Sequence, residues 1–271
     1  MDFLFDLENP LISFKEHQSD IVPTLFSDEC VLFVDNFPAK FRRDGLMVIS
    51  KFCENLDPLV SYLAVNYMDR FISTQKVINQ EKPWMVGLVA ITCLSLAAKM
   101  RNSSIDISNL SGYQRMVYDA KLIGRMEVLI LTCLKWRMRS ITPFSFICYF
   151  LSLLKLKDMT FLSQAIKERA SRIILKSSYE IKLLEFRPSV IAASALLHAS
   201  QDLVPRQHSH IRAAISTCKY LNNENVEDCL CIMQEMGFDS SESISVLDYQ
   251  CPSSESDSST SIKKRRLDDV F

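Results

Sequence analysis

Glycine is scarce in this sequence, and the short motifs that mark common enzyme sites are missing from it. The 271 residues include only 5 glycines, fewer than a turn-rich β-protein normally uses, so a helical protein is expected. There is no Gly-rich phosphate loop, no His-Glu-x-x-His zinc motif, no aspartate-rich metal cluster and no nucleophile motif. We therefore expect a protein that is not an enzyme, with no catalytic residues and no metal or other cofactor.

A strong charge of either sign and the pattern of a secretory signal are also lacking. The formal net charge is −1, which gives no general reason to bind nucleic acid. No charged start followed by an apolar stretch marks a secretory signal. The 9 cysteines show no C-x-x-C spacing, and those at Cys93 and Cys133 fall within apolar helical patterns, as reduced core thiols do. We expect a reducing compartment, and neither a nucleic acid nor a membrane as partner.

One uncharged segment organises the rest of the chain. Residues 84–98 carry no charge and intersperse small with large apolar side chains. An apolar surface on every side predicts a helix that is buried in a helical bundle. Spanning a bilayer takes about 20 apolar residues, so this segment is too short. Pro83 suits its first turn and Lys99 its last.

A second segment of the same character predicts two copies of one helical module. Residues 188–199 also begin with proline, carry no charge and are rich in small residues. Amphipathic helices are expected around these two central ones. They should cover about residues 41–53, 58–73, 117–136, 144–156, 162–182 and 211–236, with Thr142 as an N-cap and Gly237 as a C-cap.

This pattern divides the chain into four predicted parts. An arm (1–36) holds no long period and is expected to be extended or partly ordered. The first module (37–140) and the second (141–237) follow, and then a tail (238–271) that is too rich in Ser, Asp and Glu to form a core. The tail carries Lys263, Lys264, Arg265 and Arg266 in succession. We favour a nuclear import signal over mere solvated charge, so the nucleus is the expected location, with the cytoplasm as an alternative.

Two opposite charges occur on otherwise apolar helical stripes, Arg42 on one helix and Asp69 on the next. Burying either charge alone would cost much free energy, whereas an Arg42 to Asp69 pair would satisfy both. The spacing allows equally that both side chains reach solvent at the edges of their stripes.

The helix expected over 117–136 has two apolar faces. We interpret one face as an ordinary core stripe; it contains Leu122, Met126, Leu129, Cys133 and Trp136. The other contains Ala120, Ile123, Ile130, Leu131 and Leu134, with Glu127 in its middle. Such a helix is either central to its bundle or packs a second protein, and its carboxylate needs a cation. An internal salt bridge and a contact with a partner both remain open.

Three stretches of the sequence resemble plant D-type cyclins. They are residues 63–71 (LAVNYMDRF), 93–100 (CLSLAAKM), and 134–138 (LKWRM) with 142–146 (TPFSF). The resemblance covers about residues 37–237 and implies an all-α fold of two tandem five-helix cyclin boxes. It also implies that Lys99 and Glu127 grip the mobile helix of a kinase, and that Arg42 and Asp69 form the family's buried pair.

The chain departs from the family pattern at positions that contact partners. Arg101 and Asn102 stand where two acidic residues commonly follow the third helix. This replaces attraction with possible repulsion toward a basic partner. Val48 stands where a tryptophan is usual, and Asp44 and Gly45 fall within the family's apolar docking patch. Substrate recruitment through that patch is therefore expected to be weak.

A further departure concerns the N-terminal arm. Many D-type cyclins dock retinoblastoma-related proteins through a Leu-x-Cys-x-Glu motif, which is absent here, because residues 28–30 (DEC) do not fit it. The chain resembles a short D-type cyclin that must reach such a substrate by another route.

The resemblance implies a regulatory, activating subunit of a cyclin-dependent Ser/Thr kinase that promotes the G1/S transition and cell division. Ile123, Ile130, Leu131 and Leu134 are the expected apolar contacts with the kinase. Kinase inhibitors and a retinoblastoma-related protein are expected as further partners. The alternative is a cyclin-fold protein, partner-sequestering or transcription-associated, that binds without activating a kinase.

Overall fold

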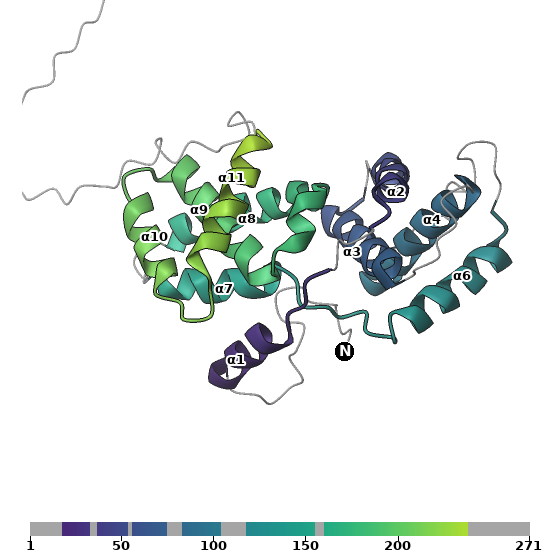
Figure 1. The fold of residues 1–271 in the computed structure, drawn as a ribbon, viewed down its shortest axis with the longest axis horizontal. Coiled ribbons are helices and arrows are strands. Elements are labelled where there is room, and N and C mark those ends of the chain that lie inside the picture. Colours follow the sequence, from purple (N-terminus) through teal and green to yellow (C-terminus); the bar gives the residue numbers. More distant parts are fainter. Residues whose placement is uncertain are drawn as a thin grey trace, which may run out of the picture.

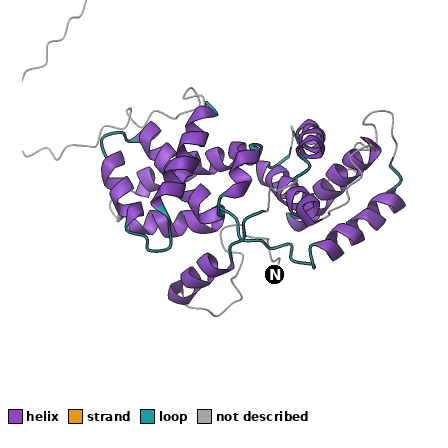
Figure 2. Ribbon diagram, in the orientation of Figure 1, coloured by secondary structure: helices purple, strands orange, loops and turns teal. Residues whose placement is uncertain are grey.

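A computed structural model describes residues 18–32, 37–53, 56–74, 83–103, 118–154 and 160–237. Every regular element in these ranges is helical, which confirms the all-α prediction (Figure 2). The predicted tail and its basic cluster lie outside these ranges.

The helices form two groups that lie side by side (Figure 1). In the first group α4 contacts α2, α3 and α6, and in the second α9 contacts α7, α8, α10 and α11. The elements are α1 (Gln18–Asp28), α2 (Ala39–Phe52), α3 (Pro58–Thr74), α4 (Pro83–Met100), α6 (Ala120–Cys133), α7 (Phe144–Leu153), α8 (Thr160–Ser177), the 3-10 helix η2 (Ile181–Glu185), α9 (Pro188–Leu203), α10 (His208–Ser216) and α11 (Asn223–Glu235). The two uncharged segments are therefore the central helices of their groups, as predicted.

Helix α4 is buried because its sequence has no polar face to expose. Residues 86–98 are all buried, including the small polar Thr92, whose hydroxyl donates to the Leu88 carbonyl at 2.7 Å. Gly87 lets Tyr118 come close: the Tyr118 hydroxyl occupies the place of a Cβ atom there and donates to the Trp84 carbonyl at 2.9 Å. The small residues thus let neighbouring elements approach α4 closely.

Several predicted boundaries were wrong. The helix expected to reach residue 182 ends at Ser177 before η2. The helix expected over 144–156 ends at Leu153, and the one expected over 117–136 covers Ala120–Cys133. Thr142 does not cap α7 with its side chain; instead, its N–H donates to the Ser145 hydroxyl at 3.4 Å. Gly237 has a φ of 59°, as expected of a C-cap glycine.

The N-terminal arm contains a helix, α1, that the sequence pattern did not reveal. The Phe26 ring of α1 stacks on Tyr220 at 4.6 Å between centroids and lies 4.8 Å from Phe146. It also meets the Tyr149 and Phe150 rings at 5.6 and 6.4 Å. These four rings belong to the second group, so α1 packs against residues far along the sequence (Figure 1). A helix of 11 residues with Pro23 inside it has a weak period of its own and depends on this contact.

Glu29 makes a second attachment of the arm. Its carboxylate accepts the Ser189 N–H at 2.9 Å and the Ser189 hydroxyl at 2.8 Å, at the first turn of α9. Burial raises the pKa of this carboxyl above its ordinary value, although the Ser189 hydrogen bonds and Arg187 oppose the shift. Glu29 of the 28–30 stretch is therefore used within the protein, where its carboxylate caps the first turn of α9.

The predicted pair of Arg42 and Asp69 forms, and it is buried. The Arg42 Nε and Nη2 atoms lie 2.9 and 3.1 Å from the two Asp69 oxygens, and both side chains are at most 3% exposed. Arg42 also donates to the Ser178 and Tyr179 carbonyls at 2.6 and 2.8 Å. Burial raises the pKa of Asp69 to about 6 because Arg42 only partly offsets the loss of hydration, so the carboxylate is ionised at pH 7. One guanidinium thus ties the two groups together.

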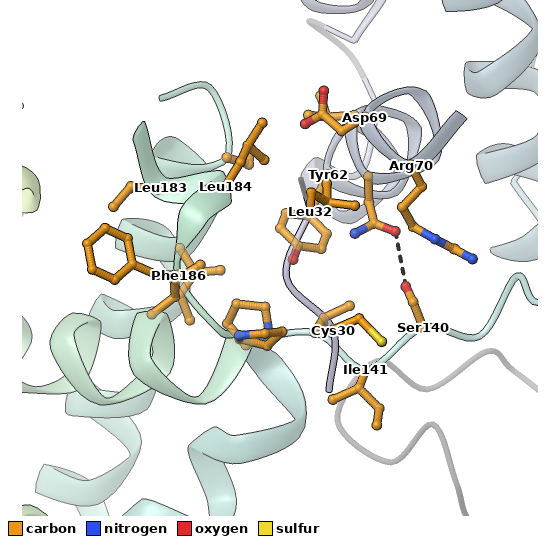
Figure 3. A pocket seen from close by; sticks show the side chains of 18 of the residues that line it. Cys30, Leu32, Tyr62, Asp69, Arg70, Ser140, Ile141, Leu183, Leu184 and Phe186 are labelled. Carbon is orange, nitrogen blue, oxygen red and sulfur yellow. Dashed lines mark hydrogen bonds between the residues drawn. The ribbon is translucent and has the colours of Figure 1, made fainter. Parts of the chain in front are cut away.

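A cavity of about 420 Å³ lies beside this junction. Figure 3 shows Tyr62, Asp69 and Arg70 of α3 on one side of it, and Leu183 and Leu184 of η2 on the other. The linker between the two groups, residues 134–143, runs along the edge of this cavity and is held to α3 by two hydrogen bonds. Arg70 donates to the Arg137 carbonyl at 2.7 Å, and the Ser140 hydroxyl donates to the Asn66 side chain at 3.0 Å. The cavity wall is therefore built from both groups and the linker.

Candidate functional site

The structure brings Lys99 and Glu127 together, although 28 residues separate them. Lys99 lies in the last turn of α4 and Glu127 in the middle of α6. The Lys99 ammonium donates to both Glu127 oxygens, at 2.6 and 2.7 Å. The buried Ser95, one turn before Lys99, donates its hydroxyl to the same carboxylate at 2.8 Å. Ser95 had not been identified from the sequence; its i, i+4 spacing to Lys99 was the available signal.

This ion pair lies at the surface. The Lys99 side chain is 57% exposed and that of Glu127 is 13% exposed. The internal salt bridge that the sequence left open is therefore present, yet one of its members remains open to a partner. The carboxylate is held in place by two donors of its own chain, which orients it before any partner arrives.

The backbone conformation at the end of α4 suits the asparagine that follows the Lys99 turn. Asn102 has a φ of 50°, in the left-handed region that asparagine tolerates better than most residues. The Asn102 N–H donates to the Lys99 carbonyl at 3.3 Å, and that of Ser103 to the Ala98 carbonyl at 2.9 Å. These bonds close the helix directly after the lysine.

Arg101 has an acidic neighbour in its own chain. Its Nη2 atom lies 2.9 Å from the Asp57 Oδ2 atom, and the arginine side chain is 19% exposed. The sequence predicted possible repulsion of a basic partner at this position. Because Asp57 balances the charge of Arg101, the structure reduces that repulsion.

The predicted apolar contact surface on α6 was largely wrong. Ile123, Ile130 and Leu134 are 2%, 0% and 5% exposed, since they pack into the core of the first group. Leu131 is half-buried. Of the four residues proposed to contact a kinase, only Leu131 offers any surface.

The prediction that the face with Leu122, Leu129 and Trp136 is a core stripe was also mostly wrong. Leu122 is 39% exposed, Leu129 48% and Trp136 65%, while Met126 is buried and Cys133 half-buried. Val128 is 57% exposed and lies on the same side of Glu127 as Leu131 does, about 100° from the glutamate around the helix. Two apolar faces gave the sequence pattern no means to decide which one packs inward.

Trp136 is exposed at the end of α6 in an unusual backbone conformation. It has a φ of 59° and follows Lys135, with a φ of 52°. Its N–H donates to the Leu131 carbonyl at 2.8 Å, which stabilises the turn. A bulky residue is rarely found in the left-handed region, and such strain is concentrated at functional positions.

The part of the chain that the structure describes contains no helix long and apolar enough to cross a membrane. It also contains no group of three or more His, Cys, Asp or Glu side chains that could hold a metal ion. His198, which the sequence pattern placed on a buried helix, is 8% exposed beside Asp202.

Comparison with known proteins identifies the family. Residues 24–139 match the description "Cyclin, N-terminal domain" and residues 141–263 match "Cyclin, C-terminal domain". The chain belongs to the cyclin family. It is 40% identical over 231 residues to "Putative cyclin-D6-1" of Arabidopsis thaliana, an overlap of 82% of this chain and 76% of that protein.

Other relatives agree with this membership. The cyclin is 34% identical over 241 residues to "Cyclin-D6-1" of Oryza sativa subsp. japonica, covering 84% of this chain and 73% of the relative. Its fold is similar to that of a viral cyclin from herpesvirus saimiri, with a TM-score of 0.57, 20% identity, and coverage of 83% and 92%. The two helical groups are thus cyclin boxes, and the resemblance to plant D-type cyclins is confirmed.

The departures in α2 also have a structural explanation in this cyclin. Val48 is 2% exposed and therefore belongs to the core. Gly45 is buried as well, and the Met68 sulfur lies where its Cβ atom would be. Val48 and Gly45 are therefore part of the core of the first cyclin box.

Proposed function

We propose that this cyclin is the regulatory, activating subunit of a cyclin-dependent Ser/Thr kinase and promotes the G1/S transition and cell division. The observation that carries the proposal is the Lys99–Glu127 pair, which is held by Ser95 and open to solvent on the lysine side. The similarity to plant D-type cyclins supports it.

The mechanism is differential binding. A kinase interconverts between arrangements in which its mobile helix is turned outward or inward, and the inward one pairs that helix's glutamate with the ATP-site lysine. A cyclin that contacts only the inward arrangement stabilises it by the difference in affinity. Lys99 and Glu127 supply a donor and an acceptor, already oriented, for the polar ends of that helix.

The apolar part of the contact falls to the residues of α6 that are exposed on the side of Glu127. Leu131 and Val128 lie there, and Trp136 follows at the helix end. This set replaces the buried Ile123, Ile130 and Leu134. Of these residues, the exposed Trp136 is of the type most often found as an anchor at the centre of a protein interface.

Replacing Lys99→Ala together with Glu127→Ala is expected to weaken the complex with a purified cyclin-dependent kinase by about 30-fold or more. Removing a partner from a desolvated charge pair at an interface costs about 2–5 kcal/mol. The dissociation constant and the phosphorylation of a retinoblastoma-related substrate would be measured, with helical circular dichroism as the fold control. Unchanged binding would reject the assignment of these two residues.

The exposed apolar surface gives a matched pair of variants. Val128→Asp, next to Glu127, is expected to weaken kinase binding about tenfold or more, because an unpaired carboxylate would be buried in the interface. Leu129→Asp is the control: Leu129 is 48% exposed, similar to Val128 at 57%, but on the far side of the helix from Leu131. Equal effects of the two substitutions would place the kinase elsewhere on α6.

The kinase assay also separates the two functions that the sequence left open. An activator raises the phosphorylation rate of the pure kinase, whereas a sequestering or transcription-associated cyclin binds without raising it.

Kinase inhibitors and a retinoblastoma-related protein are proposed as further partners. The second of these would not dock through residues 28–30, since Glu29 is committed to α9. Lys263, Lys264, Arg265 and Arg266 are proposed to direct the protein to the nucleus.

A further inference from the structure

The end of α4 that carries Lys99 is joined to the start of α3 by one carboxylate with two roles. The Asp57 Oδ1 atom accepts the Leu59 N–H at 3.0 Å and so caps the first turn of α3. Its Oδ2 atom accepts a hydrogen bond from Arg101 Nη2 at 2.9 Å. An acid at a helix start and a base at a helix end are each favoured by the helix dipole, so both members of this pair occupy stabilising positions.

The backbone fixes Arg101 relative to Lys99. The Arg101 N–H is shared between the Ala97 and Ala98 carbonyls, at 3.1 and 3.0 Å, and Asn102 closes the turn. Only one residue separates Arg101 from Lys99. Forming or breaking the ion pair of Arg101 is therefore expected to shift the helical turn that carries Lys99.

The two cations of this turn differ in what they offer a partner. The Lys99 side chain is 57% exposed, whereas that of Arg101 is 19% exposed and is directed at Asp57. The two ion pairs, Lys99 with Glu127 and Arg101 with Asp57, sum to no net charge. Arg101 is thus placed to hold the turn and poorly placed to touch a partner.

We propose that Asp57 and Arg101 form a clasp that positions Lys99 for the kinase, so that Arg101 acts on binding through Asp57 and makes no direct contact. This inference rests on the proposed function. It replaces the repulsion expected from the sequence with a positioning role.

A double-mutant cycle tests the clasp. Arg101→Gln removes the cation, and Asp57→Asn removes the anion while keeping a side chain that caps helices equally well. Each is expected to weaken kinase binding by about three- to fivefold, the upper part of the range of an exposed ion pair. The double variant is expected to be no weaker than either single one, because both substitutions open the same clasp. Arg101→Lys should restore binding to within about twofold of wild type, since the pair uses one arginine nitrogen.

The outcomes separate this inference from the proposed function. Additive losses in the double variant, or no rescue by Arg101→Lys, would mean that Arg101 touches the kinase itself and would overturn the clasp. Unchanged binding in Arg101→Gln would overturn it too. Arg212→Gln is the control, because it breaks a different arginine–carboxylate pair, with Glu227, in the second box. If Lys99→Ala with Glu127→Ala leaves binding intact in the same assay, the proposed function fails instead.

Discussion

Asp69→Asn is expected to lower the free energy of unfolding by about 3–5 kcal/mol, the usual cost of leaving one member of a buried ion pair without its partner. The Arg42 guanidinium that would be left behind is 2% exposed. Its bonds to the Ser178 and Tyr179 carbonyls would remain, but carbonyls do not neutralise its charge. Urea unfolding at pH 7.5, where Asp69 is ionised, measures the loss.

Two further variants separate a stranded charge from simple loss of packing. Arg42→Met with Asp69→Leu removes both charges at similar volume and is expected to be more stable than Asp69→Asn alone. Arg212→Gln breaks an exposed pair and should change stability by at most about 1 kcal/mol. If the double substitution were the least stable of the three, the buried pair itself would be the larger source of stability, and this account would be wrong.

Phe26→Ala is expected to release α1 from the second cyclin box, with a loss of about 3–5 kcal/mol in the free energy that holds it there. The ring is 7% exposed and meets four aromatic rings, so its removal takes away all of these contacts. Once released, an 11-residue helix is too short to persist in water. Hydrogen exchange of the α1 amides would report this as lost protection.

A local control keeps this result specific. Ser27 follows Phe26 on the same helix and is exposed, so Ser27→Ala should leave α1 protected and should change stability by less than about 0.5 kcal/mol. Protection of α1 in Phe26→Ala equal to that in the wild type would show that Glu29 alone holds the arm.

The local sequence pattern was sufficient to predict the structure where only one arrangement of a segment was favourable. An uncharged helix has only buried positions to occupy, so residues 84–98 and 188–199 identified the two central helices. Arg42 and Asp69 could be proposed as a pair because each lies on an apolar stripe and charges in a core require partners. The spacing left it open that both reach solvent, and the structure shows the pair. The same reasoning found Glu127, whose carboxylate is set among apolar residues.

Where two arrangements satisfied the same pattern, only the tertiary structure could choose. The amphipathic faces of α6 are about equally apolar, and contact with α4 decided that Ile123 and Ile130 turn inward while Val128 and Leu129 stay outside. Phe26 and Glu29 find their partners more than 100 residues away, beyond any local period. Arg101 meets Asp57 because α3 and α4 pack together, which no spacing in the sequence reports. The sequence determined which residues need a partner, and the packing of distant helices determined which partner each one has.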